Sequence, residues 1–394
     1  MSALKRWDIF CKIVDNFGDI GVCWRLCRQL RLEHGLQIRL WIDDFGAAQK
    51  IIPSLNVAEN SQICDGITVL KWHEDADFSQ AADVVIEAFA CELPSAYLAA
   101  MVKKKSKWVN LEYLSAEKWV DDFHAKPSPQ ANGLIRYFYF PGFTQATGGL
   151  IREAYSYRHS DESRNPASLK SLDSDFRRND EDCLKVSLFC YPNAPIKDLF
   201  TALQANTSGH PLSNALHEFD SPCIHAVSVY VPASSILPQI ADYFGVETIG
   251  VGDYFTRENL HVHILPFLSQ VDYDALLGDC DLNFVRGEDS WIRAIWAGKP
   301  FIWQPYFQDE NTHVKKLNAF LDLFYDNFNL KDMLCEAHRC WSLGRMPKHV
   351  WNAYLEQLTT IQTYTLQQSK LLAKQADLAA KLVIFCNKPV FTNR

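Results

Sequence analysis

Several motifs that mark common enzyme classes are missing from this 394-residue sequence. No GxGxxG fingerprint follows an expected strand and no lysine-bearing Walker loop is present, so dinucleotide redox chemistry and nucleotide hydrolysis lose support. The GxSxG elbow of α/β-hydrolases is also absent. There is no CxxC pair, and the spacing of Cys335, His338 and Cys340 is poor for zinc, so these side chains are expected to pack in a core.

Positive charge and long apolar runs are scarce as well. The formal net charge is −8, which argues against a general nucleic-acid binder but is compatible with a basic protein partner. No apolar run reaches the roughly 18 residues of a membrane span, and the first six residues lead into an expected strand without a signal-peptide pattern. The twelve cysteines are scattered, several of them in apolar segments, as reduced core cysteines are. The sequence therefore predicts a cytoplasmic protein that binds neither nucleic acid nor a membrane.

Short apolar segments alternate with helical patterns throughout the first half of the chain. The expected strands cover residues 7–14, 37–42, 67–72, 82–90, 107–114 and 135–140. Helical patterns lie between them, for example around 94–102 and 116–123. Alternation of this kind predicts an α/β fold with a parallel sheet that helices cover on both faces.

Residues 15–21, Asp-Asn-Phe-Gly-Asp-Ile-Gly, form the turn from the first expected strand into the first expected helix. In open α/β sheets such turns lie at the carboxyl ends of the strands, where ligands bind. The carboxylates of Asp15 and Asp19 would repel a phosphate, so we expect them to face a sugar hydroxyl, a cation or a proton to be removed. By local rules alone, the two side chains could equally serve only to cap the turn and the helix.

The composition changes between residues 156 and 182, where the chain is polar, charged and nearly free of large apolar residues. This stretch predicts a linker or an insertion. Strands and helices alternate again after it, with strands expected at 184–191 and 301–304 and a helix near 237–244. Long helical patterns fill the last part of the chain, including residues 350–382. The expected organisation is a Rossmann-like domain at 1–155, the polar segment at 156–182, a second Rossmann-like domain at 183–365, and helices at 366–394 that could pack back on the first domain.

The chemistry of the second half gathers in residues 286–291, Arg-Gly-Glu-Asp-Ser-Trp, again directly after an expected strand. Free amides of a helix start, the Ser290 hydroxyl and Arg286 would make a cradle for a diphosphate without a metal. Ordinary capping of the helix explains the Asp-Ser pair equally well. Two neighbouring segments support the hypothesis of a nucleotide site here. Residues 265–270 offer an aromatic face and an amide for a base, and residues 304–310 add further polar and aromatic groups.

A loop site on each of two α/β domains is typical of glycosyltransferases built from two Rossmann-like domains that face across a cleft, the GT-B type. The sequence resembles the protein-arginine rhamnosyltransferases that modify bacterial elongation factor P, the EarP family. The resemblance rests on residues 15–21, 265–267, 286–290 and 304–306, and it runs over nearly the whole chain except 156–182.

This resemblance implies inverting, metal-independent transfer of rhamnose from the donor TDP-β-L-rhamnose to one arginine of the partner, elongation factor P, without a cofactor. It also implies site residues. Asp19 would be the general base or would orient the guanidinium, Asp15 would assist, and Glu288 would support the reacting centre. The substrates would contact Asn16, Phe17 and Gly18 on the sugar and acceptor side, Tyr191, Phe267 and Gln270 at the thymine, and Arg286, Gly287, Asp289, Ser290 and Tyr306 at the ribose and diphosphate.

The chemistry of arginine agrees with carboxylates at this point. Arginine has a pKa above about 12, so its guanidinium is a poor nucleophile at neutral pH. A carboxylate pair could bind it and accept a proton as the C–N bond forms.

Three other functions compete with this interpretation. One is a GT-B enzyme with a lipid or small-molecule acceptor, which an apolar, basic membrane-facing helix would favour. Another is a non-catalytic module that binds a nucleotide or a protein partner. A sugar-nucleotide epimerase would need the NAD fingerprint that this chain lacks.

Overall fold

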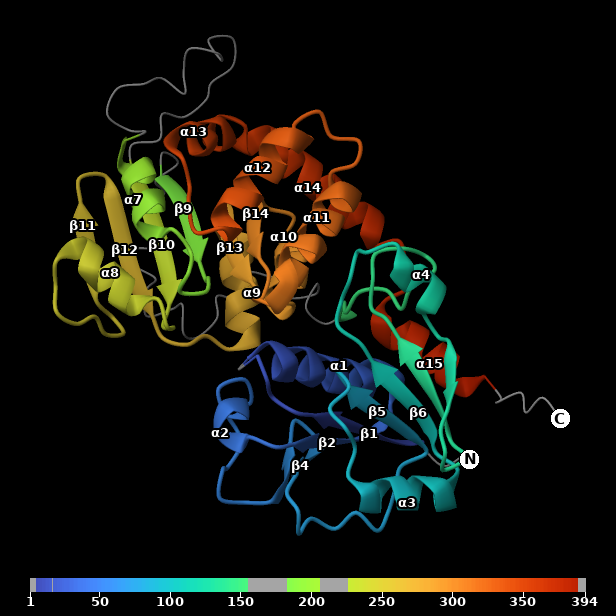
Figure 1. Cartoon of the computed structure of the whole chain (residues 1–394). Coiled ribbons are helices and arrows are strands. Elements are labelled where there is room, and N and C mark those ends of the chain that lie inside the picture. Colours follow the sequence, from blue (N-terminus) through green and yellow to red (C-terminus); the bar gives the residue numbers. More distant parts are fainter. Residues whose placement is uncertain (1–4, 16, 155–182, 206–225, 389–394) are drawn as a thin grey trace. The chain divides into compact units, whose positions relative to one another are not determined.

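The computed structural model describes residues 5–15, 17–154, 183–205 and 226–388. The chain divides into two compact units: unit 1 is Met1–Asp161 with Leu372–Arg394, and unit 2 is Glu162–Leu371. The polar segment at 156–182 and the site residue Asn16 lie outside the described residues. Each unit is built on its own sheet (Figure 1).

The sheet of unit 1 has the order β3-β4-β2-β1-β5-β6-β8-β7. Its strands are β1 (Arg6–Cys11), β2 (Gln37–Ile42), β3 (Ser61–Cys64), β4 (Ile67–Lys71), β5 (Val84–Ala88), β6 (Lys107–Leu111), β7 (Pro127–Pro129) and β8 (Ile135–Tyr139). The helices of the unit are α1 (Gly18–His34), α2 (Phe45–Ala48), α3 (Ser95–Lys104), α4 (Trp119–Phe123) and α15 (Leu378–Asn387). All strand pairs are parallel except β3–β4 and β7–β8, which pair antiparallel at the two edges.

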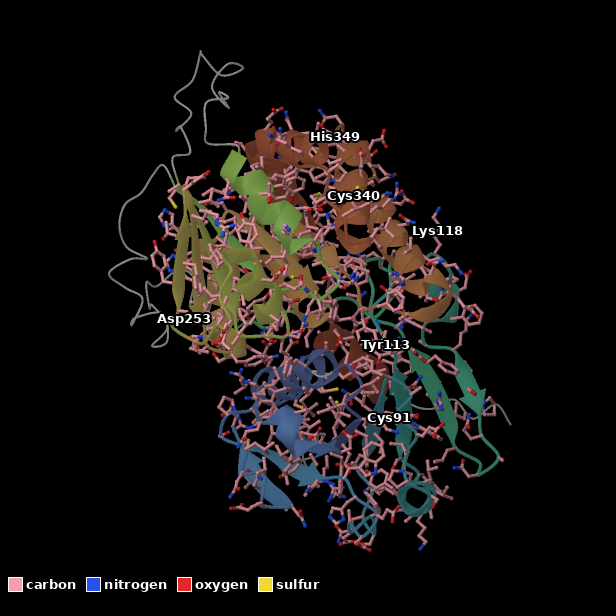
Figure 2. The ribbon with its side chains drawn as sticks, turned by 60° about the vertical axis from the view of Figure 1, so that its left-hand side comes forward. Cys91, Tyr113, Lys118, Asp253, Cys340 and His349 are labelled. Atoms are coloured by element: carbon pink, nitrogen blue, oxygen red, sulfur yellow. The ribbon has the colours of Figure 1, made fainter. Side chains whose placement is uncertain are left out.

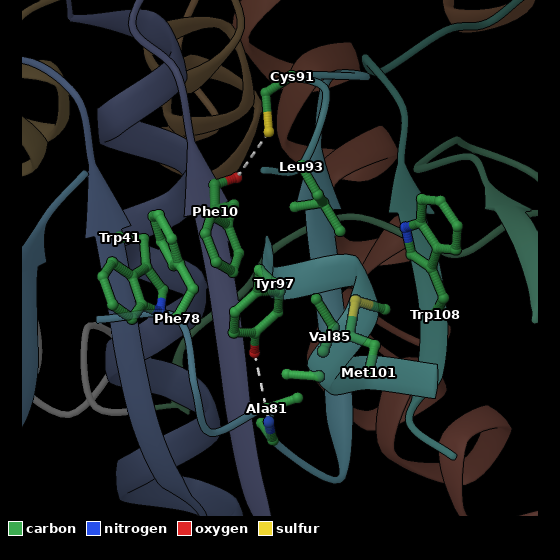
Figure 3. Packing of buried hydrophobic residues seen from close by; sticks show 12 residues of the cluster. Phe10, Trp41, Phe78, Ala81, Val85, Cys91, Leu93, Tyr97, Met101 and Trp108 are labelled. Carbon is green, nitrogen blue, oxygen red and sulfur yellow. Dashed lines mark hydrogen bonds between the residues drawn. The ribbon is translucent and has the colours of Figure 1, made fainter. Parts of the chain in front are cut away.

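An aromatic cluster fills the core on one face of this sheet (Figure 3). Phe10 stacks on Trp41 with ring centroids 5.4 Å apart and contacts Tyr97 of α3 at 4.6 Å. The fully buried carboxylate of Asp8 accepts hydrogen bonds from the Tyr97 hydroxyl and from Arg39. Burial of a charge is tolerated here because a cation and a hydroxyl satisfy it.

The last helix of the chain, α15, belongs to unit 1 although more than two hundred residues separate it from the other helices there. The Leu378 amide donates to the carbonyl of Leu150 at 2.9 Å, and the Arg152 guanidinium donates to the carbonyls of Ala373 and Gln375. Gln29 of α1 donates to the Arg152 carbonyl as well. The segment that leaves unit 1 and the segment that returns to it are therefore bonded to each other.

The sheet of unit 2 has the order β11-β12-β10-β9-β13-β14, and only β11 runs antiparallel to its neighbour. Its strands are β9 (Cys183–Leu188), β10 (Ala226–Pro232), β11 (Tyr254–Arg257), β12 (Leu260–Leu265), β13 (Leu282–Arg286) and β14 (Phe301–Gln304). Its α-helices are α7 (Ile196–Ala205), α8 (Leu237–Phe244), α9 (Gln270–Asp279), α10 (Asp289–Ala297), α11 (Thr312–Phe324), α12 (Lys331–Ser342), α13 (Lys348–Glu356) and α14 (Leu358–Leu372).

The expected α/β fold with two Rossmann-like domains is confirmed, with differences in detail. The strands at 37–42 and 301–304 and the helix at 237–244 have the expected bounds. The antiparallel strands β3, β7 and β11 were not expected, because they are short and largely exposed, without a buried apolar run. The helical pattern over 350–382 is divided among α13, α14 and α15, and α15 starts where Asp377 caps the Ala380 amide.

Three further observations concern the described part of the chain. No three His, Cys, Asp or Glu side chains gather there in a group that could hold a metal ion. None of its helices combines the length and the apolar composition that a membrane crossing needs. The eleven cysteines in these ranges form no disulfide with one another, and all but Cys183 are buried.

Candidate functional site

The topology of each sheet singles out one position for a ligand. In unit 1, β1 lies between β2 and β5, and the chain winds outward from this point in both directions. In unit 2, β9 lies in the same way between β10 and β13. Ligands of open α/β sheets bind at such switch points, outside the carboxyl ends of the strands. The relevant loops therefore follow β1 and β5 in unit 1 and β9 and β13 in unit 2.

Asp19 lies in the first turn of α1, and its side chain folds back over the loop that follows β1. Its Oδ2 atom accepts hydrogen bonds from the amides of Val14 and Asp15, at 2.8 and 2.9 Å. The residue is only 2% exposed. Its other oxygen, Oδ1, accepts from the Tyr113 hydroxyl at 3.3 Å. One carboxylate oxygen thus fixes the loop while the second is held by a side chain rather than by the backbone.

Asp15 and Gly18 are packed closely within the same turn. The Gly18 amide donates to the Asp15 carbonyl at 2.7 Å. A Cβ atom at residue 18 would lie 2.7 Å from the Asp15 carboxylate, so only glycine lets this side chain take its place. Phe17 occupies the position before the helix without capping it, and its side chain is partly exposed, as is that of Asp15.

The loop after β5 lies on the other side of the switch point and has an unusual backbone. Phe89, Ala90 and Glu92 all have positive φ angles, of 57°, 53° and 58°. Non-glycine residues adopt this left-handed region uncommonly. The Phe89 ring stacks on the Tyr113 ring with centroids 4.3 Å apart and planes 13° apart.

Two buried polar side chains hold this loop in place. Asn110 Oδ1 accepts from the Ala90 amide, and Glu87 Oε1 accepts from the Glu92 amide, both at 3.1 Å. Glu87 and Asn110 are 1% and 0% exposed. Glu87 also accepts from the Trp108 indole at 3.0 Å. The stabilisation from these hydrogen bonds offsets the free-energy cost of the left-handed backbone.

Arg286, at the end of β13, is the centre of the polar cluster in unit 2. Its guanidinium carbon lies 4.3 Å from the ring centroid of Phe189 and 4.7 Å from that of Tyr191. Its Nη1 atom donates to the carbonyl of Cys190 at 3.3 Å. Two rings and a carbonyl, with no carboxylate among these contacts, thus hold the cation in a fixed place. Burial raises the pKa of the Cys190 thiol to about 12, so this neighbour stays neutral.

The turn from β13 into α10 is closed by Ser290. Its hydroxyl donates to the Arg286 carbonyl and accepts from the Arg286 amide, the latter at 3.0 Å. Gly287, with φ +61°, supplies the left-handed residue that this turn requires. The carbonyl of Gly287 accepts from the Trp303 indole at 2.7 Å. The Ser290 hydroxyl therefore shapes the cradle expected from the sequence by fixing its backbone.

The remaining residues expected at the donor site lie around this turn. Gln270, the first residue of α9, donates to Asp289 Oδ2 at 3.2 Å. Glu288 occupies the N-cap position of α10 without capping it through its side chain. Tyr306 is 44% exposed, and its ring contacts that of Tyr191 at 5.7 Å. Phe267 lies in the loop between β12 and α9, partly buried.

The structure therefore brings the expected residues together in two groups, each within one unit. Around α1 it unites Asp15, Phe17, Gly18 and Asp19. Around α10 it forms two sets of residues in contact. The first set is Tyr191, Arg286, Gly287, Ser290 and Tyr306. The second set is Gln270 and Asp289.

Two residues of these groups were missed from the sequence. Phe189 was assigned only to a strand, and Phe89 was not singled out. Both act through stacking with residues that the sheet brings close. An aromatic residue at the carboxyl end of an expected strand, next to a charged or polar loop, was the signal that could have found them.

The fold and the two loop sites define the class of protein. A solved structure of the spinosyn rhamnosyltransferase SpnG matches with a TM-score of 0.50 at 12% identity and covers 97% of this chain and 100% of that one. At this identity the likeness concerns the fold alone, which is that of GT-B glycosyltransferases.

The family is narrower than the class. The family model described as "Elongation-Factor P (EF-P) rhamnosyltransferase EarP" matches residues 7–387, so this chain belongs to that family. A protein-arginine rhamnosyltransferase of Pseudomonas aeruginosa is 42% identical over 391 residues, which cover 97% of this chain and 99% of that protein. A solved structure, described as the structural basis for EarP-mediated arginine glycosylation of translation elongation factor EF-P, matches with a TM-score of 0.62 and 30% identity, covering 97% and 98% of the two chains.

Proposed function

We propose that this chain transfers L-rhamnose from TDP-β-L-rhamnose to an arginine side chain of elongation factor P. The observation that supports this most directly is that an EarP-family chain has a buried carboxylate, Asp19, at the switch point of one unit and an arginine-centred cluster at the switch point of the other unit. The relative from Pseudomonas aeruginosa is a protein-arginine rhamnosyltransferase, and the similar solved structure concerns arginine glycosylation of elongation factor P.

In unit 1, Asp19 acts as the general base or orients the acceptor guanidinium. Its Oδ2 atom is committed to two backbone amides, so the reacting oxygen is Oδ1. The arginine nitrogen attacks the anomeric carbon, the bond from that carbon to the TDP oxygen breaks, and the proton of the attacking nitrogen passes to Oδ1. Asp15 assists on the same turn, and Asn16, Phe17 and Gly18 line the sugar and the acceptor.

In unit 2, Arg286 and the first amides of α10 bind the diphosphate. The negative charge that develops on TDP as its bond to the sugar breaks is met by the guanidinium and by the helix N-terminus. Phe267 and Gln270 hold the thymine, with Tyr191 close by. Gly287, Asp289, Ser290 and Tyr306 hold the ribose and the diphosphate, Ser290 by fixing the turn that presents Arg286, and Glu288 supports the reacting centre.

The product has inverted configuration at the anomeric carbon, because a single displacement places the attacking nitrogen opposite the departing diphosphate. No metal is required in this scheme, since Arg286 and the helix amides supply the positive charge that a metal would bring. TDP-rhamnose is a substrate here, and no cofactor takes part.

The test is the intact mass of purified elongation factor P after incubation with this protein and TDP-rhamnose, beside reactions with UDP-glucose and with no donor. We expect a gain of one deoxyhexose on one arginine, located by fragmentation, with TDP-rhamnose alone. A protein that binds TDP but leaves elongation factor P unmodified would point to the alternative of a GT-B enzyme with another acceptor.

A further inference from the structure

The contact between Tyr113 and Asp19 joins residues 94 positions apart in the sequence. Asp19 Oδ1, the oxygen left over from the loop bonds, accepts from the Tyr113 hydroxyl at 3.3 Å. Tyr113 lies in the loop after β6, two strands away from β1 in the sheet. Tyr113, which Figure 2 labels, and Asp19 both belong to unit 1.

Tyr113 is held in turn by the strained loop after β5. Phe89 stacks on it, and the direction of the Phe89 ring depends on the left-handed backbone at residues 89 and 90. That backbone is secured by Asn110 and Glu87, both buried and both bonded to amides of the loop. Strain of this kind persists only where the surroundings enforce it, and it gathers at functional sites.

We propose that Phe89 and Tyr113 are positioning residues for Asp19, and that the left-handed loop at 89–92 exists to hold them. The inference rests on the proposed function only in assigning Asp19 to the transfer step. The loop holds Phe89, Phe89 holds the Tyr113 ring, and the Tyr113 hydroxyl fixes the rotation of the Asp19 carboxylate about its Cβ–Cγ bond. The second oxygen therefore has one orientation when the acceptor nitrogen arrives.

The first test is the pair Tyr113→Phe and Tyr137→Phe, each measured with elongation factor P and TDP-rhamnose. Tyr137 is the matched control, because it also lies partly buried in unit 1, on β8, where its ring contacts Phe385. We expect Tyr113→Phe to lower kcat about tenfold while the KM of TDP-rhamnose and the Kd of TDP stay unchanged, as loss of one hydrogen bond to a charged group predicts. Tyr137→Phe keeps the wild-type kcat. Equal kcat in both variants would overturn the proposal.

The second test addresses the loop through Ala90, whose side chain is exposed, so that substitutions there change no packing. Glycine accepts φ +53° without cost, whereas a β-branched residue does not. Ala90→Gly is expected to keep kcat, and Ala90→Val to lower it at least about fivefold, because the displaced Phe89 ring releases Tyr113. If the two variants have the same kcat, the left-handed loop has no part in catalysis and the proposal fails.

A double-mutant cycle on stability tests the contact without any transfer assay. Tyr113→Phe should lower the equilibrium constant for folding in the wild-type background and have no effect in the Asp19→Ala background, because the carboxylate that accepts the bond is missing there. Additive effects would mean that the two side chains do not interact. A wild-type protein that shows this coupling but no transfer would contradict the proposed function and leave the contact established.

Discussion

The turns at the two switch points occupy the same place in their sheets but carry charges of opposite sign. In unit 1 the first turn of α1 is closed by a carboxylate, whose Oδ2 takes the amides of Val14 and Asp15. In unit 2 the first turn of α10 is closed by the neutral hydroxyl of Ser290, and the charge is a cation, Arg286, set against two aromatic rings. One fold therefore presents an anion at one site and a cation at the other by changing which side chain closes the turn.

The comparison has a mechanistic meaning. Aromatic rings hold the Arg286 guanidinium without neutralising it, so its charge remains available to a diphosphate. Backbone amides hold one oxygen of Asp19 and leave the other for a proton. Substitutions at the first turn should therefore affect transfer, and substitutions at the second should affect nucleotide binding.

The largest effect is expected from Asp19→Asn, in the first turn of α1. An amide cannot take the proton from the acceptor, so kcat should fall by about a thousandfold while the Kd of TDP, measured by calorimetry, stays within about twofold. Asp122→Asn, at an exposed aspartate of α4, is the control and should transfer normally. A collapse of TDP affinity in Asp19→Asn would count against the role of base.

The next effect is expected from Arg286→Ala, at the corresponding place in unit 2. Loss of a charged partner of the diphosphate should raise the Kd of TDP by about 10- to 100-fold. The control is Arg257→Ala, because Arg257 also lies over two rings of unit 2, those of Tyr243 and Phe244, away from the α10 turn. TDP affinity that stays the same in Arg286→Ala would move the diphosphate site elsewhere.

A smaller effect is expected from Ser290→Ala, which separates the shape of the second turn from its charge. The Arg286 amide and carbonyl both lose their partner, so the free energy of unfolding should fall by about 1–2 kcal/mol in a denaturant titration. TDP should bind about threefold to tenfold more weakly to Ser290→Ala than to the wild type. In the Arg286→Ala background, Ser290→Ala should cause no further loss of TDP affinity, because the guanidinium is already missing. Full additivity with Arg286→Ala would show that Ser290 contacts the nucleotide independently of Arg286.

The smallest effect concerns acid stability, where the two units resemble each other. His124 of unit 1 accepts from the Phe140 amide, and His338 of unit 2 accepts from the Trp303 amide. Burial lowers the pKa of His124 to about 4 and that of His338 to about 3. Below pH 6.5 these two imidazoles bind protons in the unfolded chain but not in the folded protein. Their contribution to the free energy of unfolding is therefore complete above pH 6.5 and is lost as the pH falls toward the folded-state pKa values.

The prediction is a slope of at most about 1.4 kcal/mol per pH unit from each group between pH 6 and 4. Glutamine at either position keeps an acceptor for the backbone amide without titrating, so stability should fall less steeply with acid in His338→Gln and in His124→Gln. Unfolding titrations at pH 4, 5, 6 and 7 measure this. If the free energy of unfolding of His338→Gln falls with acid as steeply as that of the wild type, other groups cause the loss of stability.

Local sequence predicted the elements whose cause is local. Strand β14 and helix α8 follow from an apolar run and from apolar spacing ended by Gly245, which has φ +73° at the C-cap. The two strand-to-helix turns could be placed for the same reason. The roles of the individual site residues came from the family resemblance, because no local pattern indicates them.

The interactions that define the site could not be predicted in this way. The bond from Tyr113 to Asp19 and the stacking of Phe189 on Arg286 depend on which strands become neighbours in the sheet. The two interactions of the Ser290 hydroxyl depend on the course of a turn that capping preferences alone do not fix. In the same way, the left-handed loop at 89–92 contains no glycine that would have marked it.

The bonds between residues 150–154 and 372–378 show that unit 1 is closed without the segment between them. Arg152 reaches the carbonyls of Ala373 and Gln375, so the outgoing and returning segments of unit 1 lie beside each other. Unit 2 is therefore an insertion between two adjacent points of a host domain, which keeps its whole sheet and α15 without it. A short glycine–serine bridge from Ala154 to Leu372 should restore a continuous host that carries the carboxylate site as a single-domain protein.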